Sequence, residues 1–243
     1  MPGCQSSARL PISDPVIPGP ADAAQQIIGK SVSGAPIVLF RFGASAPTDR
    51  NILFFAGIHG SEGTTVGVAR KFVEELNANP PTLDVNLYII PLANPDGYAA
   101  KSRVNANAVD LNRNFPATNW KASQRKTKYW NGPSPLSEPE SRALHDLVLK
   151  LKPIRILSMH SIKGGKHGNN FDGPAEHLAE LMASKNGYNV LPTMGYTTPG
   201  SFGSWAGIDL GIPTITLELP SNISWEMAWK QNRQALWAFV LGQ

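Results

Sequence analysis

The sequence predicts an α/β protein: a single-domain, three-layer α/β/α sandwich built on a mixed, mostly parallel twisted sheet. Strand-like and helix-like segments alternate along most of the 243 residues, as in folds whose strands are connected by helices. Several strand-like segments are continuously apolar, which is typical of strands that helices cover on both faces. No internal repeat and no linker divides the chain, so we expect one domain with a substantial core.

The strand candidates are rich in β-branched and aromatic residues, and the helix candidates repeat apolar residues at helical spacing. The strand candidates span residues 35–42, 51–58, 85–93, 154–160 and 213–219. The helix candidates span residues 62–77, 137–151, 174–186 and 223–241. Residues 1–22 are rich in Pro, Ser and Gly, so we expect an extended N-terminal arm there and the folded domain over residues 23–243.

Two predicted helices carry a capping pattern or an apolar stripe, and one predicted loop is unusually long. Ser137 and Glu140 form a capping-box pattern at the start of the helix 137–151, and Pro139 lies in its first turn. The stretch 94–136 is long and irregular for a compact domain, and such loops are often functional. The helix 223–241 has an apolar stripe made of Trp225, Ala228, Trp229, Leu236 and Phe239.

Composition excludes several classes of protein. The net charge is +4 without any run of basic residues, so we expect an anionic small ligand and no nucleic acid. Cys4 is the only cysteine, which excludes an intramolecular disulfide and an all-thiolate metal site. No apolar segment approaches the roughly 18 residues of a membrane span. The first residues lack the pattern of a signal peptide, so we expect a cytoplasmic protein.

Chemically reactive side chains gather where the predicted strands end. His59 and Glu62 follow one strand, His160 ends another, and Glu218 ends a third. In α/β sheets, ligands bind beyond the carboxyl ends of the strands. Two histidines and one carboxylate are the minimum protein ligands of a catalytic zinc, and a further carboxylate can serve as general base. A buried carboxylate at Glu218 would need a partner or a chemical role.

Other histidines offer alternatives to this set. His177 and Glu180 repeat the spacing of His59 and Glu62, but they lie within a predicted helix, where we expect them on a solvated face. His145 also lies within a helix and is expected at the surface or near a cap. His167, in a glycine-rich loop, is the one rival to His160 as a metal ligand.

The segment RVNANAVDLNRNFPATNW (103–120) is polar and lacks helical or strand periodicity. Arg103 and Arg113 can bind carboxylates through paired hydrogen bonds, and Asn112 can add a donor. Asp110 can orient an arginine. The alternative is an ordinary solvated loop rich in turns.

With these residues assembled, the chain resembles the zinc carboxypeptidases of the carboxypeptidase A type. The motifs HGSE, NPDG, DLNRNF, SMH and TLEL occur in the family's order over residues 51–220. The resemblance implies one Zn²⁺ per chain, held by His59, Glu62 and His160, with Glu218 as general base. Cobalt or manganese can occupy similar sites, so the sequence leaves the metal open.

The same resemblance assigns roles in substrate binding. Asn112 and Arg113 would hold the terminal carboxylate of the substrate, and Arg103 would polarise the scissile carbonyl. Tyr196 stands 22 residues before Glu218, at the interval of the family's mobile tyrosine, so it would donate a hydrogen bond to the substrate. The alternative for Tyr196 is an ordinary aromatic residue of a loop.

Longer stretches, including IGKSVSGAPI, SEPES and GYTTPGSFGSWAGIDLGIPTITLELP, closely resemble the bacterial murein peptide amidases. Those enzymes act in the cytoplasm on the amide between D-glutamate and meso-diaminopimelate, so the resemblance implies a small anionic murein peptide as substrate. Gly203 stands near the expected bottom of the specificity pocket, where no acidic residue is expected. Lys163, Lys166 or Asn169 would contact extra carboxylates, unless the lysines are simply surface residues.

Three other functions stay open. A general metallocarboxypeptidase would use the same residues to release C-terminal amino acids from peptides. An N-acyl amino-acid deacylase shares the zinc arrangement, although the DLNRNF and GSFGSW contexts fit it less well. A zinc-dependent binding module without catalysis is the third, and the presence of Glu218 argues against it. The sequence does not indicate an oligomeric state.

Overall fold

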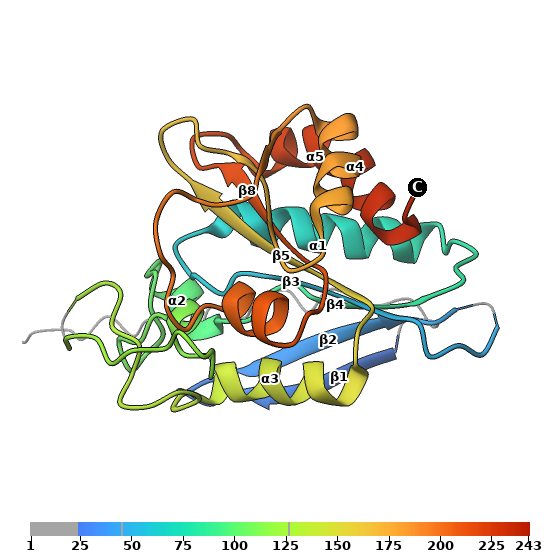
Figure 1. The fold of residues 1–243 in the computed structure, drawn as a ribbon. Coiled ribbons are helices and arrows are strands. Elements are labelled where there is room, and N and C mark those ends of the chain that lie inside the picture. Colours follow the sequence, from blue (N-terminus) through green and yellow to red (C-terminus); the bar gives the residue numbers. More distant parts are fainter. Residues whose placement is uncertain (1–23, 45, 126) are drawn as a thin grey trace, which may run out of the picture.

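A mixed eight-stranded sheet crosses the molecule and has helices on both faces (Figure 1). The computed structural model describes residues 24–44, 46–125 and 127–243, so the expected arm over 1–22 lies outside the described residues. The strands are β1 (Ala24–Lys30), β2 (Pro36–Phe42), β3 (Asn51–Ala56), β4 (Asn86–Ile90), β5 (Arg155–Ile162), β6 (Gly168–Asp172), β7 (Asn189–Leu191) and β8 (Thr214–Pro220). Their spatial order is β1-β2-β4-β3-β5-β8-β6-β7.

The centre of the sheet is parallel, which brings several strand ends to one edge. β3 pairs in parallel with β4 and β5, and β5 pairs in parallel with β8. Antiparallel pairs join β1 to β2, β2 to β4, and β6 to β8. The predicted mixed sheet is therefore confirmed, and the carboxyl ends of β3, β5 and β8 lie side by side.

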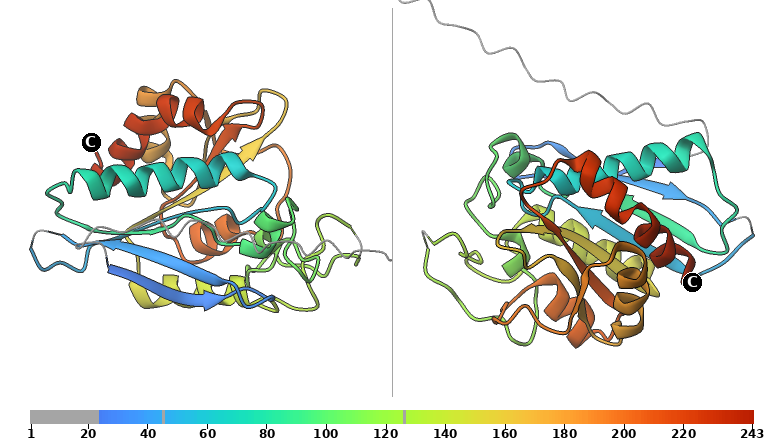
Figure 2. Two further views of the ribbon diagram at one scale, coloured as in Figure 1. Left: turned by 180° about the vertical axis from the view of Figure 1, so that it is seen from behind. Right: turned by 90° about the horizontal axis from the view of Figure 1, so that it is seen from above.

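Helices cover both faces, as the apolar strands require. α1 (Gly63–Ala78), α4 (Glu176–Asn186) and α5 (Trp225–Leu241) lie on one face. α3 (Pro139–Leu151) and the π-helical segment η2 (Gly203–Asp209) lie on the other (Figures 1 and 2). Along β3, Phe54 packs on Phe72 of α1, while its neighbour Phe55 packs on Phe202 beside η2. No helix among the described residues is long and apolar enough to cross a membrane.

The start of α3 differs from the prediction. The helix begins at Pro139, and its N-cap residue Glu138 makes no capping hydrogen bond, so the predicted capping box is wrong. Ser137 Oγ instead donates to the Glu138 carboxylate at 2.8 Å. The Glu140 carboxylate is buried and accepts a hydrogen bond from Asn105 Nδ2 at 3.1 Å. Ser137 thus bonds to its neighbour Glu138, and Glu140 bonds to the distant Asn105, in place of the cap that the sequence favours.

The apolar stripe of α5 is confirmed except at its first residue. Ala228, Leu236 and Phe239 are buried in the core that α5 shares with α1 and α4, and Trp229 is partly buried against it. Trp225 remains 39% exposed, so its predicted place in the buried stripe is wrong. It is the first helical residue, where only one side of the indole meets the neighbouring helix.

Buried asparagines organise the long stretch between β4 and α3. Asn94, Asn105, Asn114 and Asn131 are almost fully buried, and each bonds to backbone or carboxylate groups of the same region. Asn114 Nδ2, for example, donates to the carbonyl oxygens of Asn131 and Ser134. These amides take the place of a regular hydrogen-bond ladder. The stretch also contains α2 (Pro95–Ala99) and the 3₁₀ turn η1 (Leu111–Arg113).

Candidate metal centre and active site

Two histidines and one carboxylate converge at the carboxyl edge of the sheet. His59 follows β3, Glu62 precedes α1, and His160 lies in β5. The Nδ1 atoms of His59 and His160 lie 2.9 and 3.2 Å from the two carboxylate oxygens of Glu62, and 3.1 Å from each other. Among the described residues, this is the only group of three or more His, Cys, Asp or Glu side chains whose atoms converge within 4.8 Å.

Glycines allow the chain to turn between His59 and the end of β3. Gly57 has a φ of +66°, a conformation that glycine adopts without strain. Gly60 lies against the backbone of α2, where a Cβ atom would approach the carbonyl carbon of Gly97 to 1.9 Å. Thr65 Oγ1 then donates to the carbonyl oxygen of Glu62 at 2.8 Å. The HGSE motif is therefore a tight connection that holds both ligand-type side chains on one side.

The electrostatics of this group suit a cation. Burial alone would lower the pKa of His59, but the carboxylates of Glu62 and Asp110 raise it to about 8. Burial would raise the pKa of Glu62, but the two histidines hold it well below its usual range. Two imidazole nitrogens and a carboxylate oxygen are the donor set of catalytic zinc sites, so the residues fit zinc.

Asp110 contacts His59 at the ring nitrogen that does not face Glu62. Its carboxylate is fully buried and lies 3.0 Å from Nε2 of His59. The same carboxylate accepts hydrogen bonds from Arg103 Nε at 3.0 Å and from the backbone N–H of Asn112 at 3.1 Å. The predicted contact with an arginine is confirmed, whereas the contact with His59 was not foreseen. A carboxylate behind a ligating histidine fixes the tautomer and the direction of the ring.

Glu218 is the second carboxylate of the site. It lies on β8 directly opposite His160 in the parallel register, and it is 8% exposed. Within the described parts of the chain, no group donates a hydrogen bond to its carboxylate. Burial and repulsion by Glu62 raise the pKa of Glu218 to about 8. A carboxyl group that has a pKa close to neutral pH and no hydrogen-bond partner is suited to transfer protons.

The two arginines lie beside this carboxyl edge. Arg103 Nη1 is 3.7 Å from the Glu62 carboxylate, and Arg113 Nη1 donates to the backbone carbonyl of Asn112 at 2.6 Å. Both guanidinium carbons lie over the ring of Tyr129, at 5.4 and 5.8 Å from its centre. Asn112 Nδ2 is 3.4 Å from His160 Nε2. The polar loop therefore brings three predicted substrate-binding residues to the histidine pair.

Tyr196 lines the same pocket as Glu218. Burial and the neighbouring Glu218 carboxylate raise the pKa of its phenol group. The side chain is still 52% exposed, so its hydroxyl has room to meet a bound molecule. The structure thus places the predicted tyrosine at the rim of the pocket.

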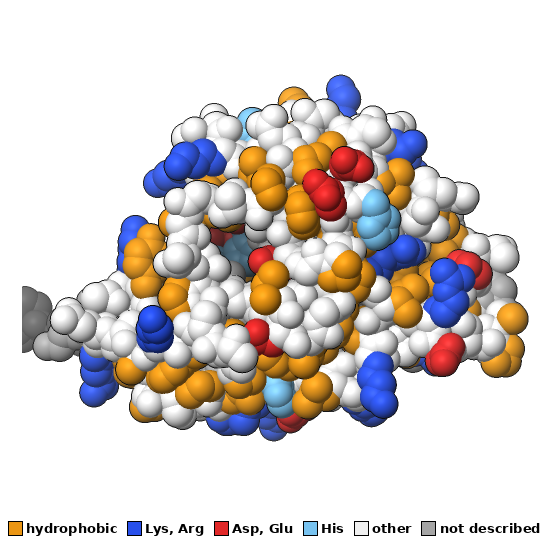
Figure 3. All heavy atoms as spheres, in the orientation of Figure 1, with side chains coloured by type: hydrophobic (Ala, Val, Ile, Leu, Met, Phe, Trp, Pro, Cys, Tyr) orange, Lys and Arg blue, Asp and Glu red, His pale blue; other side chains and the backbone are white. Residues whose placement is uncertain are grey.

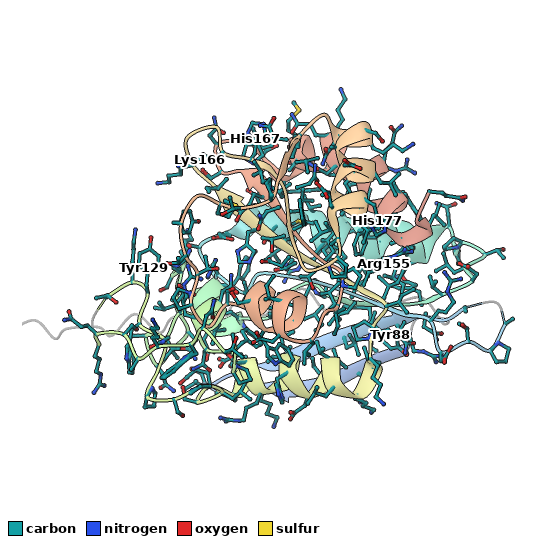
Figure 4. All side chains as sticks on the ribbon, in the orientation of Figure 1. Tyr88, Tyr129, Arg155, Lys166, His167 and His177 are labelled. Atoms are coloured by element: carbon teal, nitrogen blue, oxygen red, sulfur yellow. The ribbon has the colours of Figure 1, made fainter. Side chains whose placement is uncertain are left out.

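The rival residues lie elsewhere. The ring of His167 packs on Tyr188, with ring centres 4.7 Å apart, in the part of the molecule remote from Tyr129 in Figure 4. Asn169 is fully buried and bonds to Asn186, so its predicted contact with substrate is wrong. Lys163 and Lys166 are exposed.

Of the two remaining histidines, His177 behaves as expected, whereas the expectation of a surface or capping position for His145 is wrong. His177 and Glu180 are exposed on α4, which confirms a solvated face. His145 is half-buried and stacks on Trp205 with ring centres 4.9 Å apart. Its Nδ1 atom lies 2.8 Å from the Asp146 carboxylate.

A hollow opens over the site, and histidine and acidic side chains are visible inside it in Figure 3. Its pocket is lined by residues of β6, β8 and the segment before η2, including Asn170, Asp172, Thr216 and Glu218. Gly203 is also part of the lining. A Cβ atom on Gly203 would lie 2.1 Å from Asp172 Oδ2, so the expectation that no acidic residue lies at this place is wrong. The carboxylate comes from a strand that the sequence did not predict.

Comparison with known proteins identifies the family. The sequence pattern of the zinc carboxypeptidase family matches residues 20–171. This chain belongs to the zinc carboxypeptidase family. It is 35% identical over 207 residues to murein peptide amidase A of Escherichia coli K12, with 79% of each chain covered.

Two solved structures share the fold. The murein-tripeptide amidase MpaA of Escherichia coli O157 superposes with a TM-score of 0.73 at 33% identity, covering 89% of this chain and 90% of that one. The carboxypeptidase A of Helicoverpa armigera gives a TM-score of 0.77 at 19% identity, covering 89% and 67%. The chain is accordingly a zinc metallopeptidase or amidase, and zinc is the metal of its family.

Proposed function

We propose that this chain is a zinc-dependent amidase that hydrolyses the amide between the γ-carboxyl of D-glutamate and meso-diaminopimelate in murein peptides. Cytoplasmic recycling of cell-wall fragments is the process we propose for it. The names of its relatives support the substrate class. The observation that carries the chemistry is Glu218, a buried carboxylate without a partner that stands opposite His160.

In this proposal His59, Glu62 and His160 hold the zinc ion. Bound zinc would lower the pKa of a water molecule towards about 7 and would polarise the scissile carbonyl. Asp110 keeps the His59 ring directed at the metal through its contact with Nε2. Glu62 is itself held by the backbone N–H of Ser161, which donates to Oε2 at 3.0 Å.

Glu218 transfers the protons. It removes a proton from the attacking water and then delivers it to the nitrogen of the leaving amine. A general base is most efficient when its pKa lies near the working pH, and the burial of Glu218 raises its pKa in that direction.

The arginines bind the anionic parts of the substrate. Asp110 occupies Nε and Nη2 of Arg103, which leaves Nη1 as the donor for the oxyanion that develops at the scissile carbonyl. A donor in such a position is often worth a few kcal/mol in the transition state. Arg113 and Asn112 bind the terminal carboxylate of the leaving residue, and Tyr196 adds a hydrogen bond from the rim.

The decisive experiment uses the purified protein and the tripeptide L-alanyl-γ-D-glutamyl-meso-diaminopimelate, with and without a chelator. Mass spectrometry should detect release of diaminopimelate only when zinc is present. Glu218→Gln should lower turnover by about 10²–10⁴-fold while one zinc per chain remains bound. Glu180→Gln, which changes an exposed residue of the same type, is the matched control and should behave as the wild type.

Each contrary outcome has a distinct meaning. Near-wild-type turnover by Glu218→Gln would remove this residue from the role of general base. Cleavage of ordinary C-terminal dipeptides in place of the murein tripeptide would indicate a general metallocarboxypeptidase. Bound zinc without turnover on any of these peptides would indicate a binding module.

A further inference from the structure

Three cationic side chains surround one half-exposed tyrosine in the loop before α3. The guanidinium carbons of Arg103 and Arg113 lie 5.4 and 5.8 Å from the centre of the Tyr129 ring, and the ammonium nitrogen of Lys128 lies 4.8 Å from it. Tyr129 is 45% exposed. Cations at these distances are attracted to the electron-rich face of an aromatic ring. The ring therefore keeps a flexible lysine beside two arginines, although like charges repel one another.

Only one of these three charges has an acidic partner among the described residues. The Asp110 carboxylate lies 3.0 Å from both Nε and Nη2 of Arg103. Arg113 and Lys128 form no ion pair in the part of the chain that the structure describes. In the proposed function, Arg113 binds the terminal carboxylate of the leaving residue. Lys128 is then a cation that has no counterpart in the proposed mechanism.

Lys128 does not belong to the pocket that contains Glu218 and Tyr196. That pocket is lined by residues between Asn170 and Glu218, and by no residue of the loop before α3. A substrate that places its leaving side chain in this pocket does not bring that side chain to Lys128. The lysine instead borders the two arginines from the loop, where the acyl part of the substrate can pass.

The separation of Lys128 and Arg103 suits a carboxylate on the acyl side of the scissile bond. Both cations are measured to the same ring centre, so Lys128 Nζ and the Arg103 guanidinium carbon lie within about 10 Å of each other. In a γ-linked glutamate, three carbon atoms separate the scissile carbonyl carbon from the free α-carboxylate, a span of about 5 Å when extended. A hydrogen bond of about 3 Å at each end allows both groups to be contacted at once.

We infer that Lys128 is a specificity-determining residue that binds the free carboxylate of the residue on the acyl side of the scissile bond. The inference rests on the proposed function, in which that residue is γ-linked D-glutamate and Arg103 contacts the scissile carbonyl. Tyr129 positions the lysine through the face of its ring. The α-carboxylate of glutamate is the one anionic group in the acyl part of the tripeptide, so Lys128 selects acyl groups that carry it.

The test compares two tripeptides that differ only at this carboxylate. One is L-alanyl-γ-D-glutamyl-meso-diaminopimelate, and in the other the α-carboxylate of glutamate is a carboxamide of nearly the same size. Wild-type protein should prefer the carboxylate peptide by about 5- to 20-fold in kcat/KM, between the values for an exposed ion pair and for a hydrogen bond to a charged group. The difference should lie in KM, because the contact is the same in the bound substrate and in the transition state. Added salt should reduce it.

Three variants assign the preference to one side chain. Lys128→Met removes the charge and keeps the length of the side chain, so it should abolish the preference, and Lys128→Arg should restore most of it. Lys121→Met changes another exposed lysine of the same loop and is the matched control, which should keep the wild-type preference. A preference that persists in Lys128→Met would overturn the inference, whether or not the rates on both peptides fall together.

A second pair of peptides separates this inference from the proposed function. An α-linked glutamate also has three carbon atoms between the scissile carbonyl carbon and its free carboxylate, and α-linked glutamine is its uncharged analogue. If the wild type cleaves only α-linked peptides and prefers glutamate through Lys128, the γ-glutamyl assignment fails and the inference stands. If it cleaves both γ-linked peptides equally well, the inference fails and the proposed function stands.

Discussion

The chain contains the spacing His-x-x-Glu twice, and the two copies have opposite environments. His59 and Glu62 are buried at a strand end, 2.9 Å apart, and each has a further polar partner. His177 and Glu180 lie exposed on α4. The same two residue types therefore form part of a metal centre in one place and an ordinary helix surface in the other.

The difference lies in the neighbours that each fold position supplies. A strand end in a parallel sheet is flanked by the ends of adjacent strands, so β5 delivers His160 and β8 delivers Glu218 to the first copy. A helix surface has solvent on that side and no third ligand. The His-x-x-Glu spacing allows two side chains to reach one ion. The order of the strands in the sheet determines whether a third ligand lies beside them.

The sharpest test replaces the glutamate in each copy. Glu62→Gln removes an anionic ligand and leaves His59 and His160 facing an uncharged amide, so zinc affinity should fall by more than about 100-fold. Glu180→Gln is the matched control and should retain one zinc per chain. Zinc content after dialysis and competition with a chromogenic chelator measure both. Wild-type affinity in Glu62→Gln would show that the buried copy is not the metal site.

A second pair of variants compares the carboxylates behind two histidines. Asp110→Asn weakens the support of His59 Nε2, and zinc affinity should fall by about 10- to 100-fold. Asp146→Asn changes the exposed partner of His145 and should leave zinc affinity unchanged. Chelator competition again supplies the measurement. If Asp110→Asn alters kcat or KM at unchanged affinity, the residue acts through Arg103 alone.

The smallest effect concerns the pH dependence of the chelator-treated protein. The pKa of His59 is raised from its ordinary 6.5 to about 8, so the native state binds this proton more tightly than the unfolded chain. That stabilisation is complete below pH 6.5 and disappears as the pH rises through 8, a loss of between about 1 and 2 kcal/mol. Glu218, whose pKa is also raised to about 8, contributes in the same direction.

Urea unfolding at a series of pH values, in the presence of a chelator, measures this loss. His177→Gln should show the same pH dependence as the wild type, because its histidine is exposed. With saturating zinc the loss should vanish, since metal binding requires deprotonated ligands and strengthens as the pH rises. A free energy of unfolding that stays constant between pH 6.5 and 8 in chelator would contradict the prediction.

The sequence predicts the central strands and the main helices because their residues are apolar and regularly spaced. β2, β3 and β4 fall within predicted segments, and β5 and β8 overlap theirs but extend one or two residues beyond them. β1, β6 and β7 were missed because their residues are polar, contain glycine or, for β7, number only three. Such strands form by pairing with a neighbour that is already in place, and local preference does not reveal them.

Parts of the site that depend on tertiary pairing, and not on local sequence preference, could not be predicted either. The strand ends that carry His59, His160 and Glu218 could be located, so their convergence follows from a parallel sheet. The neighbourhood of Asp172 depends on β6 and on the π-helical segment η2, and neither has a recognisable sequence pattern. The contact between Asp110 and His59 joins segments 51 residues apart, and only the folded loop creates it.

The stacking of Arg103 and Arg113 on Tyr129 has a consequence for affinity. Long basic side chains usually lose rotational entropy when they grip an anion, at a cost of about 0.5–1.5 kcal/mol each. Here Asp110 and the aromatic ring already restrain both guanidinium groups. Most of that ordering is completed when the chain folds, so a short anionic peptide can bind with little further loss of freedom in the protein.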